Sequence, residues 1–487
     1  MLKLLITKEL KNIIASPKFT ATFATCAILI LLSVFIGIQE YQTAVRQYDT
    51  ARQLLAQEIA ETSSWMGISN RVFRKPDPMQ IFSAGIHYDI GRFSDVGAWE
   101  EVKLRRSAYS DDPIFAIFRF IDFAFIVQVA MSLLAILFTY DAINGERERG
   151  TLKLTFANPV PRAQYILGKF FGSWLGLVIP VLIPMLLALL LVLLYQIPLT
   201  GAHWMKIISL FGISILFFTF FITFGLLVSA LTRSSASSFL ILLVSWVTLV
   251  LIIPRASVMI AGQFVSVPSV AEIESKQAKF EQERWDQSAI AMDKRFEERN
   301  AKMVGITKEE REAYEDENMW NWMQEEDAER KIVQQDITEY HRKLQEDLRN
   351  RRAAQEELAF MLSRFSPASA YQLAVMNLSG NGISLKTRYE DAMEAYRDIF
   401  VDFVEEKRKE SGGHGGLRIS ISGEDGVSIS TGDVKSLDVS ELPQFDAPAH
   451  TIRDVAAPMI IDSGLLALYI ALAFAGAFWG FVRYDVR

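Results

Sequence analysis

The chain has 487 residues, of which 51% are hydrophobic and 22% charged, and its formal net charge is -7. Long stretches carry almost no charge while others consist largely of Glu, Gln, Lys and Arg, which is typical of a protein with membrane-embedded and water-exposed parts. The acidic balance argues against binding to nucleic acid, and the single cysteine, Cys26, excludes an intramolecular disulfide.

The N-terminal stretch 1–17, MLKLLITKELKNIIASP, predicts an amphipathic helix that lies in the membrane interface. Pro17 then breaks the chain direction. Glu9 falls within the apolar stripe, so its carboxylate either reaches past the lipid to water or has a partner inside the protein. The basic front and apolar core are also found in signal peptides. However, GIQEY follows the core instead of a small-residue cleavage site, which favours an uncleaved anchor.

The apolar stretches predict the fold class, since a membrane span needs about 20 mostly apolar residues. We expect an all-α polytopic membrane protein with about six transmembrane helices. Its large, mainly helical extracytoplasmic domain should contain a coiled-coil hairpin and a small β element. The predicted parts are the interfacial helix at 1–17, spans at 18–39, 114–140, 170–195, 204–231, 236–259 and 457–482, a first extracytoplasmic region at 40–113, a cytoplasmic loop at 141–169, the large extracytoplasmic domain at 260–455, and a cytoplasmic tail at 483–487.

Lysine and arginine near the span ends indicate the orientation. They gather at the N-terminus, in the loop at 141–169, in the turn that holds Arg233 and in the tail that holds Arg483 and Arg487. With an even number of spans these four segments share one side of the membrane. We therefore expect both termini in the cytoplasm and the large domain outside.

Polar side chains within the spans need a reason, because charge in lipid is costly. Arg119 and Asp122 are three residues apart near the outer end of the second predicted span, hence on one helix face, and Gln128 lies deeper. The pair fits a structural ion pair or side chains that reach the interface. The alternative is a role in lining a substrate route.

The external stretch from 269 to 365 is dense in charge, with widely spaced apolar residues, and predicts two long antiparallel helices. Thr307 and Glu310 form a capping-box pattern that restarts the helix. LRISIS and GVSIS around GEDG predict a β-hairpin further on. The long helices are either a solvated spacer or a stalk that docks an external partner or a second copy. The apolar seam of the second helix is Val333, Ile337, Tyr340, Leu344 and Leu348.

No motif in the sequence supplies its own chemistry. LGKF at 167–170 lacks the upstream glycine and the following Ser or Thr of a phosphate-binding loop. LSGNG at 378–382 only faintly resembles the ATPase signature LSGGQ. The five histidines show no metal-ligand spacing, and no GxSxG is present. We expect a chain that is not an enzyme, with no catalytic residue, metal or cofactor of its own.

The loop at 141–169, DAINGERERGTLKLTFANPVPRAQYILGK, is charged and helix-prone. Its charges can select a soluble partner and its apolar residues can anchor one, although it fits an ordinary connector equally well. It resembles the cytoplasmic loop of type-2 (export) ABC transporter permeases, whose pattern is roughly D-x-I-x-G-E-x-E-x-G-T-L, then P-V-x-R and L-G-K. The matching residues are Asp141, Ile143, Gly145, Glu146, Glu148, Gly150, Thr151, Leu152, Pro159, Val160, Arg162, Leu167, Gly168 and Lys169.

Two further segments are similar to this family. TKELKNIIASPKF places Glu9 at a position that is usually acidic in the family's N-terminal helix. SPASAYQLA resembles a stretch in the branch with a large extracytoplasmic insert before the last span. That branch includes permeases of gliding-motility and nitrous-oxide-reductase-maturation transporters.

The resemblance implies a permease subunit in the bacterial cytoplasmic (inner) membrane, surrounded by lipid and paired with a second copy or a paralogue. It implies a separate cytoplasmic ATPase dimer that binds ATP and Mg. The loop would then hold a coupling helix seated on the ATPase, with polar contacts from Glu146, Glu148 and Arg149 and a groove filled by Leu152 and Phe156. The residues expected to couple are Glu146, Arg147, Glu148, Arg149, Gly150, Thr151, Leu152, Phe156, Pro159 and Arg162.

Two functions follow from the resemblance and remain open. One is export of an unidentified substrate driven by ATP hydrolysis in the ATPase subunit. The other is mechanotransmission, in which the external helices signal to an extracytoplasmic protein partner and no cargo crosses. A structural or sensor protein without an ATPase is disfavoured by the loop motif.

Overall fold

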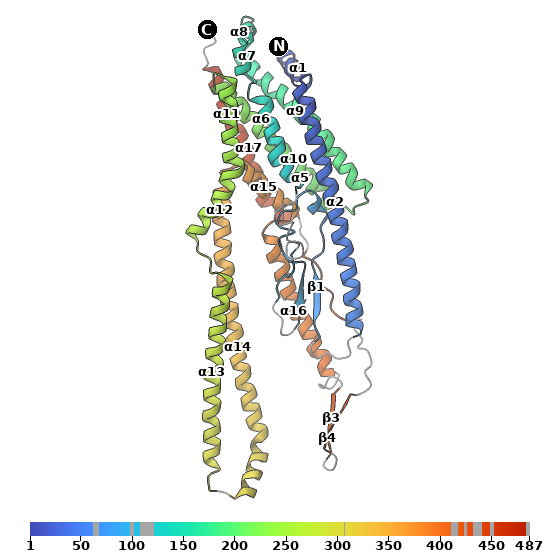
Figure 1. Ribbon diagram of the computed structural model, residues 1–487, viewed down its shortest axis with the longest axis vertical. Coiled ribbons are helices and arrows are strands. Elements are labelled where there is room, and N and C mark those ends of the chain that lie inside the picture. Colours follow the sequence, from blue (N-terminus) through green and yellow to red (C-terminus); the bar gives the residue numbers. More distant parts are fainter. Residues whose placement is uncertain are drawn as a thin grey trace. The chain divides into compact units, whose positions relative to one another are not determined.

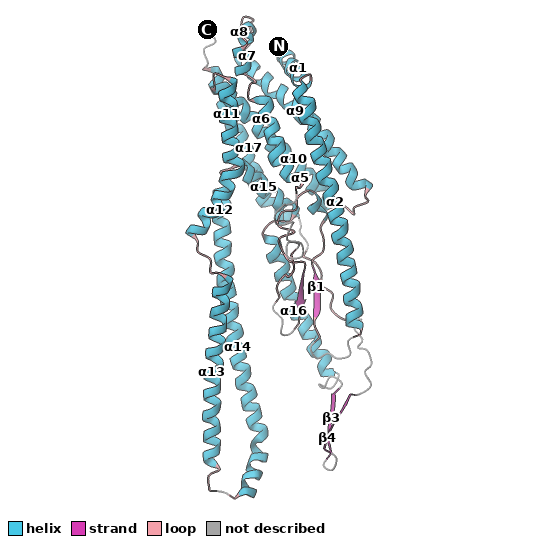
Figure 2. Cartoon of the chain, in the orientation of Figure 1, coloured by secondary structure: helices cyan, strands magenta, loops and turns pink. Residues whose placement is uncertain are grey.

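The computed structural model describes residues 1–61, 68–97, 102–107, 121–305, 307–410, 417–422, 426–431, 441–448 and 452–483. Helices dominate these residues, and the strands form two small antiparallel sheets (Figure 2). The chain divides into two compact units. We call Met1–Ile252 with Arg364–Arg487 the membrane unit, and Ile253–Ser363 the hairpin unit.

Six helices among the described residues are long and apolar enough to span a membrane, which confirms an all-α polytopic membrane protein. The residues before them form α1 (Leu2–Ile14). The six are built from α2 (Pro17–Ala60), α5, η2 and α6 (Phe123–Ile126, Val127–Met131 and Ser132–Thr139), α9 (Arg162–Leu194), α10 (Gly201–Leu231), α11, η3 and α12 (Ser235–Trp246, Val247–Ile252 and Ile253–Phe264), and α17 (Ile452–Val482).

The first span continues as one helix beyond the predicted end at residue 39. Helix α2 has 44 residues, because the polar stretch after the apolar run contains no Pro or Gly and is rich in helix-forming residues. The region that we expected to begin at residue 40 therefore starts as an extension of the span.

The second span begins later than predicted, at Phe123. Asp122 has extended backbone angles and caps this helix: its carboxylate accepts from Phe125 N at 2.8 Å and from Ala84 N at 2.9 Å. The expectation that Arg119 and Asp122 share a helix face is wrong for Asp122, which precedes the helix. Arg119 lies outside the described residues. Gln128 lies half-buried in η2.

Helix α10 is the most deeply buried of the six spans and forms the centre of the main core. It packs against α17, α6 and α15 (Pro367–Ser379) (Figure 1). Tyr371 of α15 stacks on Phe217 with 4.5 Å between ring centroids, and the hydroxyls of Tyr371 and Ser214 are 3.2 Å apart. The sequence placed 367–379 in the external domain. The structure corrects this, because its small and apolar residues fit among the spans.

Two spans contain π-helical turns that are tied to one another and to α15. These turns are η2 and η3, and such turns often mark functional positions. Trp246, just before η3, donates its indole N–H to Ser132 Oγ at 2.8 Å, just after η2. Ser366 caps α15 and donates its hydroxyl to the Leu249 carbonyl in η3.

A second core lies at the end of the membrane unit opposite α7 and α8 (Figure 1). Strands β1 (Asn70–Phe73) and β2 (Phe93–Val96) pair there. Between them in sequence, the short helix η1 (Pro78–Ile81) packs into the main core instead. Helix α16 (Ser384–Glu410) packs Met393 and Phe400 into the second core. The predicted β-hairpin is confirmed as β3 (Leu417–Ser422) paired with β4 (Gly426–Thr431).

The hairpin unit contains α12 and the two long helices that were predicted, α13 (Val270–Lys302) and α14 (Lys308–Ser363). The predicted seam is confirmed: Val333 and Ile337 are buried, and Tyr340 stacks on Phe280 at 3.9 Å. The capping box is confirmed as well, since Thr307 N donates to Glu310 Oε2 at 3.0 Å. The hydrogen bonds that the Glu310 carboxylate accepts from Thr307 lower the pKa of this carboxyl group.

Candidate functional site

The loop between the second and third spans folds into two short helices. They are α7 (Asn144–Glu148) and α8 (Thr151–Phe156). Gly150 lies between them with φ of 73°, a left-handed conformation that favours glycine, and it turns the chain. Pro161 then precedes the first residue of α9, a position where its missing N–H leaves no intrahelical bond unmade.

The loop is bonded to the turn between α10 and α11. Buried Asn144 donates its side-chain amide to Thr232 Oγ1 at 3.0 Å. Glu148 accepts from the backbone N of Ser235 at 2.8 Å and from its hydroxyl at 2.7 Å. The loop therefore has a fixed seat on the neighbouring spans.

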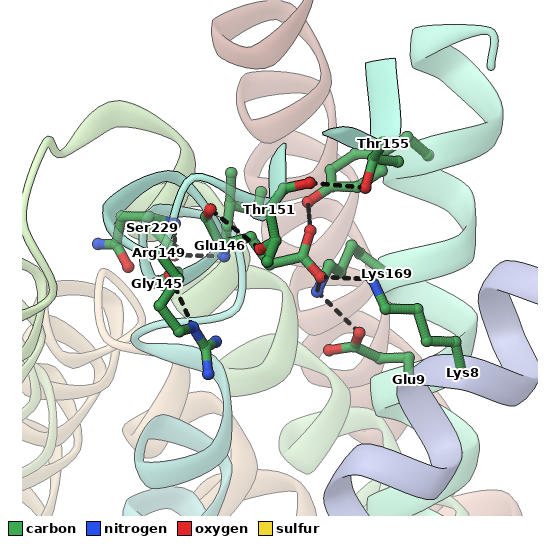
Figure 3. Close-up of polar contacts among 12 residues, drawn as sticks. Lys8, Glu9, Gly145, Glu146, Arg149, Thr151, Thr155, Lys169 and Ser229 are labelled. Atoms are coloured by element: carbon green, nitrogen blue, oxygen red, sulfur yellow. Dashed lines mark hydrogen bonds and ion pairs between the residues drawn. The ribbon is translucent and has the colours of Figure 1, made fainter. Parts of the chain in front are cut away.

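An ionic cluster ties Glu146 of α7 to the neighbouring helices, and it is buried except at Lys8 (Figure 3). Lys169 Nζ lies 2.7 Å from Glu9 Oε2 and 3.1 Å from Glu146 Oε1. Lys8 Nζ is also 3.1 Å from Glu146 Oε1, and Tyr165 donates its hydroxyl to Glu146 Oε2 at 2.7 Å. We call these five residues the anchor network. Two carboxylates meet two ammonium groups, so the charges balance within it.

The anchor network joins the loop and the start of α9 to the distant N-terminal helix. Glu9 belongs to α1, Glu146 to the loop and Lys169 to α9. Of the two alternatives for Glu9, the structure supports a partner inside the protein. Glu9 is 8% exposed, so its carboxylate does not reach open water.

Glycines on α9 make the approach of α1 close enough for this contact. Gly168, Gly172 and Gly176 recur every fourth residue and so share one helix face. A Cβ on Gly172 would lie 2.5 Å from the Glu9 Cβ, and one on Gly168 would lie 2.7 Å from the Leu5 Cβ. Any side chain there would push α1 away, because real Cβ atoms do not approach so closely.

The other side of the loop packs on the end of the last span. Tyr165 stacks on Phe481 of α17 with 5.0 Å between centroids, and Phe156 lies 5.3 Å from the Tyr165 ring. Arg162 donates to the Val482 carbonyl. Leu152 is buried in this small core. The N-terminal helix, the loop, the turn with Arg233 and the end of α17 thus gather at one end of the membrane unit (Figure 1).

Two of the predicted coupling residues cannot contact a partner directly. Glu146 and Leu152 are 5% and 2% exposed, so the expectation that they touch an ATPase surface is wrong. Phe156 is half-buried against Tyr165. Arg147 donates to the Thr232 carbonyl at 3.1 Å, and Arg149 donates to the Gly145 carbonyl at 3.0 Å. The loop residues exposed to solvent are Glu148, Arg149, Gly150, Thr151, Lys153, Leu154, Ala157, Asn158, Pro159 and Pro161.

Sequence reasoning missed the roles of Lys8, Tyr165 and Phe481 and gave Lys169 no task. A lysine within an otherwise apolar helix, one residue after the first of three glycines at four-residue spacing, was the signal that could have found it. Leu154 is one of the apolar loop residues that the sequence offered as an anchor for a partner, and it is 69% exposed. Among the described residues, no group of three or more His, Cys, Asp or Glu could hold a metal ion.

These features define a multi-pass membrane protein. The loop between its second and third spans is folded, fixed to the neighbouring helices and exposed to solvent at its tip. The chain belongs to the ABC-2 transporter family, because the model of that family, described as ABC-2 family transporter protein, matches residues 4–486. It is a membrane permease subunit of the ABC transporter type.

Two curated relatives match a short part of the chain. They are the proteins named "Probable ABC transporter permease protein NosY" of Pseudomonas aeruginosa and of Stutzerimonas stutzeri. Each is 53% identical over 45 residues, which is 9% of this chain and 16% of the relative. Because so little of each relative is covered, their names indicate the class of protein and do not assign a substrate.

Proposed function

We propose that this permease subunit couples ATP hydrolysis by a separate ATPase subunit to the export of an as yet unidentified substrate across the bacterial cytoplasmic membrane, with both termini in the cytoplasm. ATP and Mg bind to the partner ATPase in this proposal. The absence of a phosphate-binding motif from the sequence supports a division of labour between two kinds of subunit.

The observation that carries the proposal is the contrast between the base and the tip of the loop. Glu146 and Leu152 are buried, while Leu154 is 69% exposed, directly after exposed Lys153 and five residues after exposed Arg149. An apolar side chain surrounded by charge on a rigid platform is the arrangement that anchors a soluble partner. The loop is therefore the docking surface for the ATPase.

The anchor network makes the loop a mechanical link. Force on the tip reaches the second and third spans directly, since the loop connects them. It also reaches α1 through Glu9 and α17 through the stack of Tyr165 on Phe481. A movement of the ATPase would displace these helices as a packed group.

Leu154→Glu tests the proposal. We expect loss of the copurifying ATPase subunit and at least tenfold lower ATP hydrolysis in the membrane complex, with unchanged thermal unfolding. The matched control is Ile332→Glu, which removes an exposed aliphatic residue in the hairpin unit and should leave both readouts unchanged. Full ATPase retention and activity in Leu154→Glu would contradict the proposed docking surface.

Mechanotransmission is the second candidate, favoured by the length of α14. Its 56 residues extend about 84 Å at 1.5 Å per residue. Mass spectrometry of the complex purified from its native membrane separates the two. An ATPase with an enriched lipid, glycan or peptide supports export. An ATPase with a stoichiometric extracytoplasmic protein and no such molecule supports mechanotransmission.

A further inference from the structure

The distal half of the hairpin unit carries four large apolar side chains beside the seam and not in it. In the proximal half the seam is apolar and buried at Val333 and Ile337. Nearer the turn the two helices face each other through polar groups instead, with Arg295 Nη2 2.9 Å from Glu326 Oε2 and Arg299 over the ring of Trp322 at 5.1 Å. Trp322 and Met303 pack within the pair, but several other large apolar residues of this half are exposed.

Four of these residues lie on one side of the hairpin. Met292 and Phe296 each follow a residue of α13 that faces α14, and Met319 and Met323 each follow a residue of α14 that faces α13. One position past the seam is a rotation of about 100°. Because the two helices are antiparallel, the side chains one position past the seam on α13 and on α14 point to the same side of the pair. We call these four residues the lateral face.

The lateral face is open to solvent within the hairpin unit. Phe296 is 61% and Met323 60% exposed, and the register set by Arg295 and Glu326 puts them at one level. Met292 and Met319 extend the face along the two helices, and both are also exposed. A third helix laid along it would contact both α13 and α14, as in a three-helix coiled coil.

The surroundings of the lateral face are acidic. From 290 to 329 the chain has thirteen acidic and six basic residues, an excess of seven negative charges. Glu315 and Asp327 continue the stripe of Met319 and Met323 one turn to either side. Each has an exposed i,i+4 cation partner, a contact that contributes little in water.

This charge decides between occupants. A second copy of the hairpin would bring the same negative excess against itself, and an anionic lipid surface would be repelled as well. A helix with apolar residues on one face and Lys or Arg beside them satisfies both the methionines and the carboxylates. Methionine is unbranched and adapts to such a partner. We propose that the lateral face docks a cationic amphipathic helix of an extracytoplasmic protein as a third helix.

The test uses the full-length protein in its native membranes, with a photocrosslinking amino acid placed at position 296 or 323. Positions 290 and 332 are the matched controls. Ile290 and Ile332 are also exposed but each precedes a seam residue, which puts them on the opposite side. We expect adducts from 296 and 323 to one protein, joined through a Lys- and Arg-rich helical peptide, and at least tenfold fewer adducts from 290 and 332.

The chemistry of the contact is checked with the adduct at position 296 as the readout. Met323→Gln and Asp327→Asn should each reduce the yield of this adduct several-fold, whereas Ile332→Gln should not. The yield should also fall in 0.5 M salt. Equal labelling on both sides, no adduct, or an adduct to lipid, to a second copy or to another part of this chain would overturn the proposal. ATP hydrolysis by the complex is measured in parallel, so a failure here is distinguishable from a failure of the docking role of Leu154.

Discussion

The ammonium of Lys169 lies 2.7 Å from a carboxylate oxygen of Glu9, although 160 residues separate the two in sequence. The same ammonium reaches Glu146, so one cation holds the N-terminal helix and the cytoplasmic loop together. All three side chains are nearly closed to solvent. The orientation of the loop therefore depends on a buried contact, and that contact can be broken without touching the loop's exposed tip.

Lys169→Met should destabilise the loop and α1 together. The substitution keeps an unbranched side chain but removes the cation that Glu9 and Glu146 share, and breaking a buried ion pair in this way costs about 3–5 kcal/mol. Hydrogen exchange of α1 and α7 in detergent measures the effect. Lys153→Met is the control, since Lys153 is exposed and its loss should change stability by less than about 0.5 kcal/mol. Equal protection in both variants would contradict the structural role of the network.

Gly172→Ala should separate α1 from α9. The added methyl group would meet the Glu9 Cβ at 2.5 Å, and overpacking of this kind costs about 1–3 kcal/mol. Thermal unfolding of the purified protein provides the measurement. In Gly212→Ala the new methyl group meets nothing within 4 Å, so this variant should be neutral or slightly stabilised, as expected for alanine in a helix. A stable Gly172→Ala variant would mean that α1 does not need this close approach.

Arg364→Met should destabilise the membrane unit through Asp462. Arg364 Nε lies 2.6 Å from Asp462 Oδ1, and the Asp462 side chain is fully buried in α17. Removal of the arginine leaves that carboxylate buried without its partner, at a cost of about 3–5 kcal/mol. The double variant Arg364→Met/Asp462→Leu removes both charges and should recover most of the loss in unfolding experiments. Equal stability of the single and double variants would show that the pair contributes no coupling.

The part of the protein around His87 should lose stability in acid. Burial, and secondarily the Arg74 guanidinium, holds the pKa of His87 well below its ordinary 6.5. Arg74 Nη1 lies 2.7 Å from His87 Nδ1, which requires a neutral ring. The unfolded chain then binds a proton below pH 6.5 that the folded chain does not, so stability is fully present above that pH and falls as pH drops through it.

The slope of unfolding free energy against pH between 5 and 7 measures this effect. It should reach at most about 1.4 kcal/mol per pH unit for one proton. His87→Gln should flatten the slope, whatever its effect on absolute stability. An unchanged slope in His87→Gln would assign the acid sensitivity to other groups.

Local pattern was sufficient for much of the fold. The spans follow from runs of apolar residues, the seam at Val333 and Ile337 from helical spacing, and the capping box from Thr307 and Glu310. Each signal lies within a few residues of sequence and acts on the backbone directly. The errors occurred where a local pattern has two readings: Asp122 could lie in a helix or cap one, and 367–379 could lie outside the spans or among them.

The sequence by itself determined that the chain crosses a membrane several times, that it carries a charged loop of the ABC permease kind, and that a long helical pair interrupts it before the last span. These properties depend on composition and on periodicity along one helix. Only the tertiary structure decided that Glu146 and Leu152 face inward while Leu154 faces out, and that Glu9, Glu146 and Lys169 meet. The contact between Glu9 and Lys169 joins residues 160 positions apart, and its geometry is set by how closely α1 can approach the glycines of α9.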